Sequence, residues 1–457
     1  MNKARLLMIS LVLLTLIGSF LKTLFGTVGL PNVMPAVRDP LLIGLAFYGI
    51  GKLDFFSSRK WLIFLAATLT FVFPYLLIAM LEDRALIGLY YIRLYVLPFL
   101  FFIGALGILG NSEDIDVRRS LLRFFIYWNN LLFIVAASIY ALLQSEPSIR
   151  ATLFGPDLLP TAWYISGGTW MRMGLPLSGP NTLGLVFALN AFLFFGLLIT
   201  QKTGLNQLNI STKSVLLAAL LAVGGLLLSF SRSSMLLLFV ALPLFMMTPG
   251  VMTFNKFFTF AFVGTLMLAL LAALALFVDE TSDGFVTRWI VLNTSFSDPS
   301  MLGHFRSIAD AMDKLHEYIL WGYPKGTVGP KAAIFTGLTN SVENSFLAVL
   351  YDMGLPIGVT YSIAVVTLLA TGYHNRYQLV LLASFLPPFF LLPYVFEIDV
   401  QIYFAFVFLA VGSIFSSSEM ERKKNEIHIT NSNYRESDND LRLRDQKKVP
   451  VMNFNVV

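Results

Sequence analysis

Three arginines stand in polar interruptions of a chain that is otherwise largely apolar. Arg172 comes shortly before a Gly-Pro-Asn181 turn, Arg232 lies within Ser-Phe-Ser-Arg-Ser-Ser, and Arg306 ends the run Gly-His-Phe-Arg. A guanidinium group is planar and can hold two oxygens of one phosphate, which an ammonium group cannot do. These residue types predict the binding of an anion, and a phosphate group suits them best.

The turn before Asn181 strengthens this expectation for Arg172. It leads directly into the apolar run 181–200, and the first turn of a helix leaves backbone N–H groups without helical partners. These groups and the positive end of the helix dipole attract anions. We therefore expect an anion pocket that contains Arg172, Asn181 and the start of this helix.

The elements that must position these residues are membrane spans. With 56% hydrophobic and 13% charged residues, the composition lies far from that of a soluble globular protein. At about 20 apolar residues per span, the sequence predicts an all-α polytopic membrane protein. Its twelve expected spans are 6–24, 36–52, 61–81, 91–110, 121–143, 181–200, 214–230, 233–248, 257–278, 345–370, 378–395 and 400–416.

Basic residues in the short loops predict the orientation. They gather in alternate loops, which should therefore face the cytoplasm together with both termini. Residues 1–416 then form one transmembrane domain with large outer loops at 144–180 and 279–343, and the polar tail 417–457 is expected to be disordered. The first outer loop, 27–39, is expected to be a simple connector.

Many arginines fall on the predicted outer side, against the usual preference for basic residues inside. This excess indicates that something anionic is held there. The eight outer arginines are Arg38, Arg84, Arg93, Arg150, Arg172, Arg232, Arg288 and Arg306.

The outer segment 279–344 is the only long internal stretch that could fold in water. Phe305, Ile308, Met312, Leu315 and Ile319 recur at spacings of three and four, which predicts an amphipathic helix. Asp298-Pro299 would begin it, and the turn residues after Trp321 would end it. We expect this helix to lie along the bilayer surface and to cover a space between the spans.

Absent residue types and motifs exclude several classes of function. The chain has no cysteine, and its four histidines are scattered without a metal-binding pattern, so no metal site is expected. No Walker A or GxGxxG motif is present, which argues against a nucleotide cofactor. The net charge of +5 is usual for membrane loops and gives no reason to expect nucleic acid.

Three stretches, taken in order, resemble the O-antigen ligase and polymerase superfamily. They are Arg172-Met-Gly-Leu-Pro-Leu-Ser-Gly-Pro-Asn-Thr-Leu-Gly, then Ser229-Phe-Ser-Arg-Ser-Ser, then Gly303-His-Phe-Arg306 with Leu320-Trp-Gly and Glu343-Asn-Ser-Phe-Leu-Ala-Val-Leu-Tyr-Asp-Met-Gly354-Leu-Pro-Ile-Gly358. The resemblance covers roughly residues 148–358. The earlier spans match only as generic hydrophobic helices.

The resemblance implies a GT-C-like glycosyltransferase of the bacterial inner membrane that needs no metal or cofactor. Its donor would be a polyprenyl-diphosphate-linked oligosaccharide, and a flippase and a chain-length regulator would be its partners beside membrane lipid. Ligases of the family usually have His-Asn where this chain has Glu343-Asn344. This difference favours a polymerase of repeat units, with a ligase acting on lipid A core as the alternative.

The resemblance also suggests a role for each candidate residue. Arg172 and Arg306 would stabilise the diphosphate as charge develops on it, and a carboxylate at Glu343 would accept the proton of the acceptor hydroxyl. Asn181 and Asn344 would orient sugar hydroxyls or the carboxylate. The remaining substrate-binding candidates are Arg232, Arg288 and His304.

Each candidate also has a structural alternative. Arg172 and Arg232 could anchor span ends at the lipid headgroups, and Arg306 could pair with Asp310 on its own helix. Glu343 could cap the helix that follows it, and His304 could be an ordinary helix-end residue.

Two other classes of function remain open. A transporter of lipid-linked oligosaccharide would also need many spans and outer arginines, but internal repeats and ionisable residues deep within spans would be expected of it. Nearly all ionisable residues of this chain are predicted at span ends. A scaffolding membrane protein would leave the outer arginines unexplained.

Overall fold

The computed structural model describes residues 3–27, 33–53, 58–109, 114–146, 148, 171–200, 205, 208–247, 299–329, 342 and 344–415. Every span predicted within these ranges is helical, and no β-strand is found among them. The span expected at 257–278 and the tail 417–457 lie outside the described residues.

Seven described helices are long and apolar enough to cross a membrane: α3, α4, α5, α7, α9, α15 and a last helix, Ile398–Phe415. The chain is therefore an all-helical protein of the multi-pass membrane type. The labelled elements are α1 (Lys3–Thr27), α2 (Met34–Lys52), α3 (Arg59–Leu81), α4 (Ala85–Leu109), α5 (Ile115–Ser145), α7 (Pro180–Thr200), α9 (Thr212–Ser229), α10 (Arg232–Met247), α13 (Pro299–Tyr318), α15 (Ser345–Thr371), α16 (Arg376–Leu391) and the 3₁₀ helix η2 (Tyr394–Phe396).

One group of helices contains α1, α2, α3, α4 and α15. The crossing of α2 and α4 depends on small residues, because a Cβ added at Gly49 would lie 2.4 Å from the backbone oxygen of Ile103. Small residues at such crossings let two backbones approach closely, which strengthens van der Waals packing inside a bilayer. On the other side of α4, rings of Phe71, Phe99 and Tyr361 join α3, α4 and α15.

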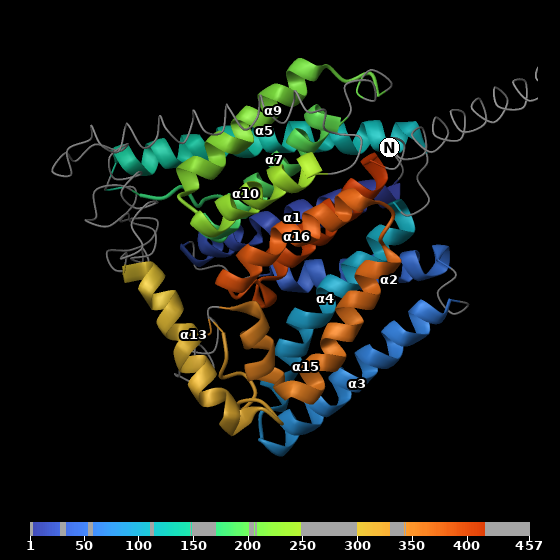
Figure 1. Cartoon of the computed structure of the whole chain (residues 1–457), viewed down its shortest axis with the longest axis vertical. Helices are drawn as coiled ribbons and strands as arrows, with labels where there is room; N and C mark the ends of the chain where they lie inside the picture. Colours follow the sequence, from blue (N-terminus) through green and yellow to red (C-terminus); the bar gives the residue numbers. More distant parts are fainter. Residues whose placement is uncertain are drawn as a thin grey trace, which may run out of the picture.

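A second group contains α5, α7, α9, α10, α16 and Ile398–Phe415. Figure 1 shows α5, α7, α9 and α10 together at one side of the molecule, α3 and α15 at the other, and α16 between them. A buried polar ladder crosses this group: Tyr403 donates to Asn190 at 2.5 Å, Asn190 to Asn129 at 3.1 Å, and Asn129 to the backbone oxygen of Ala218 at 2.9 Å. Hydrogen bonds of this kind hold neighbouring helices in register where water is absent.

The two groups meet at one end of the bundle, called here the site end. It carries the starts of α7, α10 and α15 and the short helix η2. Across it, Ser345 donates to the backbone oxygen of Leu392 at 2.6 Å, and Tyr91 donates to that of Val328 at 2.8 Å. At the opposite end, Asn375 donates to the backbone oxygen of Gly412 at 2.9 Å. This pairing of helix ends follows the alternation of loops predicted from the sequence.

Helix α15 is interrupted at Gly354, which has φ +73° and ψ 169°. Pro356 follows, and its missing N–H leaves the backbone oxygen of Asp352 without a helical donor. The freed groups are bound by the segment after α13. Tyr323 N–H donates to Tyr351 O and Leu355 N–H to Ile319 O, both at 2.6 Å. Non-helical backbone at membrane depth is tolerated only where the protein itself satisfies it.

The predicted amphipathic helix is present as α13, with Pro299 as its first residue, and it packs on the first half of α15. The contact face agrees with the predicted one in part, since Leu315 packs against the hydrophobic core. Ala311 is buried and its backbone oxygen accepts a hydrogen bond from Tyr351, whereas Phe305 and Met312 are 52% and 55% exposed. The small side chain at 311 lets α15 approach, so Phe305 and Met312 lie beside the contact.

Candidate functional site

Arg172 is held by two elements at the site end. Its Nε donates to the backbone oxygen of Ser229 at 3.1 Å, and its Nη2 donates to that of Phe230 at 3.2 Å. Both oxygens lie at the C-terminus of α9, where backbone carbonyls lack helical partners and attract a cation. Nη2 also donates to Oδ1 of Asn181 at 2.8 Å, so the guanidinium group bridges the end of α9 and the start of α7.

The turn between α9 and α10 has a geometry that presents these carbonyls. Phe230 adopts a left-handed conformation with φ 51°, which ends α9 and reverses the chain within two residues. Arg232 then begins α10 and is partly exposed. Arg172 and Arg232 are thus attached to the same hairpin, as two members of the predicted arginine set.

Serine hydroxyls fill the space beneath this hairpin. Ser231 lies 2.7 Å from Ser234 and 3.3 Å from Ser233, and Ser234 donates to the backbone oxygen of Asn181 at 3.3 Å. The helix α7 can come this close because it has Gly184 at the contact, where a Cβ would lie 2.5 Å from the hydroxyl of Ser229. The hydroxyls bind one another and the backbone, which satisfies polar groups that are almost fully buried.

The carboxylate of Glu397 lies at the start of α7. Oε2 of Glu397 accepts a hydrogen bond from Thr182 at 3.1 Å, and Thr182 accepts one from Ser178 at 2.7 Å. A carboxylate is favourable near the positive end of a helix. Glu397 follows η2 in the chain, so the last pair of helices brings it to the residues that adjoin Arg172.

Tyr394 lies between the serines and this carboxylate. Burial raises the pKa of Tyr394 well above its ordinary value, and the neighbouring Glu397 adds to the increase, while Ser233, Ser234 and Arg172 oppose it. Its hydroxyl is buried beside Ser233 and Ser234. The phenol therefore stays protonated beside Arg172.

The space next to Arg172 is small. A pocket of about 10 Å³ lies between α5, at Ala136 and Tyr140, and the segment from Met171 to Leu175. This volume is at the limit for one water molecule.

The other predicted site residues have different positions. Asn344 is the N-cap of α15: its Oδ1 accepts from Leu347 N–H at 2.9 Å, and its Nδ2 donates to the backbone oxygen of Phe390 at 2.8 Å. His304 and Arg306 both lie on α13. Arg288 and Glu343 lie outside the described residues.

Arg306 is exposed on α13 and forms no ion pair with Asp310, so the alternative of an intrahelical pair is not seen here. Arg172 donates hydrogen bonds to α7 and to the α9–α10 turn, and none of these three bonds joins it to α13. The structure thus joins Arg172 to Asn181 and to the turn that precedes Arg232, and it places Arg306 on a separate element, α13.

A second polar cluster was missed from the sequence. Asp352 is fully buried in α15 and accepts hydrogen bonds from Tyr75 at 2.9 Å and Tyr95 at 2.7 Å. Lys325, also fully buried, donates to the backbone oxygens of Asp352 at 2.5 Å and Trp321 at 2.9 Å. An aspartate several residues inside an apolar span is a signal that could have been followed.

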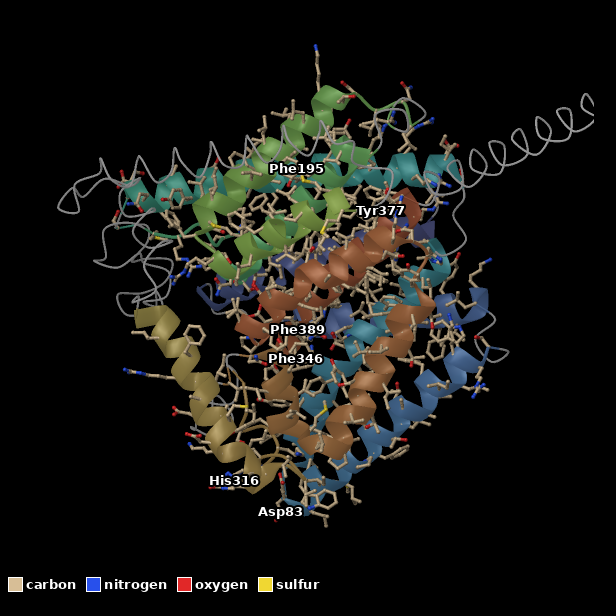
Figure 2. The ribbon with its side chains drawn as sticks, viewed as in Figure 1. Asp83, Phe195, His316, Phe346, Tyr377 and Phe389 are labelled. Atoms are coloured by element: carbon tan, nitrogen blue, oxygen red, sulfur yellow. The ribbon has the colours of Figure 1, made fainter. Side chains whose placement is uncertain are left out.

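The cluster joins the segment that follows α13 to three helices. Glu82 accepts from the backbone N–H of Lys325 at 2.6 Å, and Arg84 donates to its backbone oxygen at 3.1 Å. Figure 2 shows Asp83, in the turn between α3 and α4, close to the end of the molecule where His316 lies on α13. In this way the segment 319–329 fixes the end of α13 against α3, α4 and α15.

Comparisons with known proteins found no match: no family model, no curated protein and no solved structure matches this chain.

Proposed function

We propose that this protein is a membrane glycosyltransferase that polymerises polyprenyl-diphosphate-linked oligosaccharide repeat units. The observation that carries the proposal is the contact set of Arg172, whose guanidinium group is fixed by Asn181 and by the α9–α10 turn that bears Arg232. Preorganised cations at the place where charge develops are a main source of catalysis. The motif resemblance supplies the substrate class.

In the proposed reaction, the hydroxyl oxygen of the acceptor sugar forms a bond to the anomeric carbon of the donor chain. The bond from that carbon to the diphosphate breaks, and the electron pair leaves with the polyprenyl diphosphate. Arg172 and Arg232 stabilise the departing charge, with Arg306 approaching from α13. The hydroxyl proton passes to a carboxylate, for which Glu343 is the candidate from the sequence and Glu397 is added by its position beside Thr182.

We further propose that the site end faces outward from a bacterial inner membrane, with twelve spans and both termini in the cytoplasm. Basic residues in the short loops of the opposite end support this orientation. The arginines at the site end would remain outside as cationic partners of a lipid-linked diphosphate. No metal or cofactor is part of the proposal. A flippase that delivers the repeat units and a chain-length regulator are its expected partners.

One observation favours transport of the lipid-linked oligosaccharide instead. Asp352 is an ionisable group buried inside a candidate span, which is typical of transporters. Its contacts give it another role, since Tyr75, Tyr95 and Lys325 hold it at the break in α15. A buried group that secures a helix break needs no transported ion.

The glycan profile of a deletion strain tests the proposal. A polymerase predicts that single repeat units still reach the cell surface attached to their final acceptor, while longer chains disappear. Long chains that accumulate on the lipid carrier would identify a ligase. Units that stay on the cytoplasmic side would identify a transporter.

A further inference from the structure

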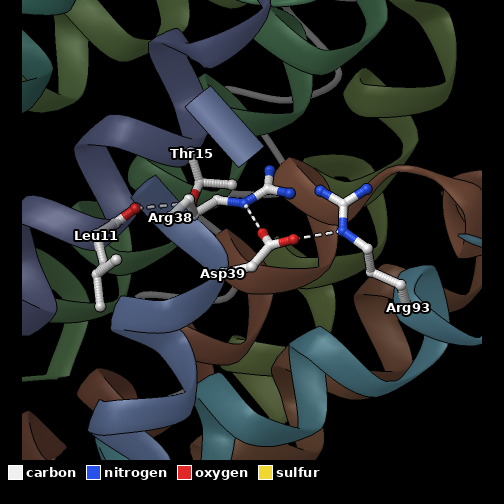
Figure 3. A network of polar contacts seen from close by, with 5 residues as sticks. All are labelled: Leu11, Thr15, Arg38, Asp39 and Arg93. Carbon is white, nitrogen blue, oxygen red and sulfur yellow. Dashed lines mark hydrogen bonds and ion pairs between the residues drawn. The ribbon is translucent and has the colours of Figure 1, made fainter. Parts of the chain in front are cut away.

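Two arginines from different helices share one aspartate at the contact of α2 and α4. Nε of Arg38 lies 3.0 Å from one carboxylate oxygen of Asp39, and Nε of Arg93 binds the other. Figure 3 shows the terminal nitrogens of both guanidinium groups on the same side, away from the carboxylate. Arg38 and Asp39 lie at the end of the stretch 27–39, which the sequence predicts to be a simple connector, and the structure includes both in α2. Arg93 lies on α4, 54 residues after Asp39.

The cluster has one positive charge more than it has negative charge. Within the described residues, Asp39 is the only carboxylate in ion-pair contact with either arginine. The side chains of Arg38, Asp39 and Arg93 are only 15%, 19% and 25% exposed, so water screens them incompletely. An unbalanced charge in such a place is costly unless an anion accompanies it.

A purely structural clamp does not account for both arginines. The pair of Arg93 and Asp39 joins α4 to α2 and is electrically neutral by itself. Arg38 is the sequence neighbour of Asp39, so its ion pair connects no further element. What Arg38 adds is a second guanidinium group beside the first, with its terminal N–H groups turned to the same side.

The surroundings are apolar and exposed. Val37 and Leu41 on α2 are 48% and 38% exposed, and Leu89, one turn before Arg93 on α4, is 53% exposed. In a membrane protein, exposed aliphatic side chains of this kind contact hydrocarbon chains. A ligand with a compact anionic group and an apolar tail therefore matches both parts of the surface.

We propose that Arg38 and Arg93 form a binding site for the phosphate group of a membrane lipid, with its tail along Val37, Leu41 and Leu89. A phosphate suits two adjacent guanidinium groups because its tetrahedral oxygens accept from several directions at once. The site is separate from the Arg172 cluster and does not depend on glycosyl transfer.

Native mass spectrometry of the delipidated full-length protein tests this site, with phosphatidylglycerol as the probe. Arg38→Gln is the main variant, because it leaves the neutral pair of Arg93 and Asp39 intact and the fold should persist. We expect phosphatidylglycerol to bind about tenfold more weakly, the loss that removal of one charged hydrogen-bond donor usually causes. Lys52→Gln, which removes the same charge at the other end of α2, should bind like the wild type.

The Arg93→Gln variant, if it folds, should bind phosphatidylglycerol more weakly in the same way. If Arg93→Gln does not fold, the result with Arg38→Gln alone decides whether the site exists. Equal affinity of the wild type and Arg38→Gln for phosphatidylglycerol would overturn the site. Inorganic phosphate that binds as tightly as the lipid, with the same dependence on Arg38, would overturn the assignment to a lipid. An equal loss in Lys52→Gln would show attraction by general charge and would also overturn it.

Discussion

Lys325 donates a hydrogen bond from Nζ to the backbone oxygen of Asp352 at 2.5 Å. This is the oxygen that Pro356 leaves without a helical donor, so a side chain of the segment after α13 takes the place of a missing backbone N–H. Gly322 and Gly354, both with positive φ, allow the two backbones to meet at this point. The break in α15 and the position of α13 are therefore parts of one arrangement.

Replacement of Lys325 by Met should destabilise the protein by about 1 to 3 kcal/mol, because it leaves the buried backbone oxygens of Asp352 and Trp321 without the hydrogen bonds that Nζ donates. Unfolding in detergent with increasing denaturant measures this change. The double variant Lys325→Met, Asp352→Asn removes both charges and should recover part of the loss. If the double variant lost as much stability as the two single variants together, the result would contradict an interaction between these residues.

The stability contributed by Lys325 should depend on pH. Burial lowers the pKa of Lys325, although the Asp352 and Glu82 carboxylates oppose this effect. Between the lowered pKa and the ordinary value of 10.5, the unfolded chain binds the additional proton. Stability from this group therefore rises as pH increases through that interval. The free energy of unfolding, compared with that of Lys325→Met across the same pH range, should show this slope only in the wild type.

Arg172→Lys should reduce polymer formation at least a hundredfold, the usual effect of removing one preorganised donor from a reaction site. A lysine keeps the charge but cannot donate to Asn181 and to the α9–α10 turn in the fork geometry of arginine. Arg119→Lys is the matched control. Arg119 also donates from Nε to a backbone oxygen, that of Leu208 at 2.8 Å, but it does so at the opposite end of the bundle.

Polymer length on glycan gels is the measurement for both variants. Normal chains from Arg172→Lys would remove Arg172 from the reaction. Equal loss in Arg119→Lys would show that only the fold had been affected.

The two carboxylates can be separated by paired substitutions. Glu397→Gln keeps an oxygen that can accept from Thr182 but removes the charge. Glu343→Gln removes the charge of the other candidate. Replacement of the carboxylate that takes the proton of the acceptor hydroxyl should slow glycosyl transfer about a hundred- to ten-thousandfold. Binding of the donor should not change. The turnover rate with saturating donor measures this step. Wild-type rates in both variants would exclude both residues.

The helices were predictable because long apolar runs leave few alternatives in a membrane protein. The juxtaposition of Arg172 and Asn181 was accessible for a similar reason, since only eight residues separate a basic side chain from a helix start that attracts polar groups. Local sequence carries both signals.

Other features depend on contacts between distant parts of the chain. Thr182 and Glu397 are 215 residues apart, and no local pattern brings them together. The contact face of α13 follows from the small side chain of Ala311 and from the partner helix, whereas hydrophobic spacing alone favoured Phe305 and Met312. The role of Lys325 could be predicted only with the break in α15 already known.

Reconstitution of the purified protein in liposomes with a polyprenyl-diphosphate-linked oligosaccharide tests the central claim most directly. The account predicts a ladder of glycans that increase by one repeat unit, together with release of polyprenyl diphosphate, and it predicts that Arg172→Lys abolishes both. A substrate that binds but stays a single unit with the wild-type protein would contradict the proposed transfer at the arginine cluster.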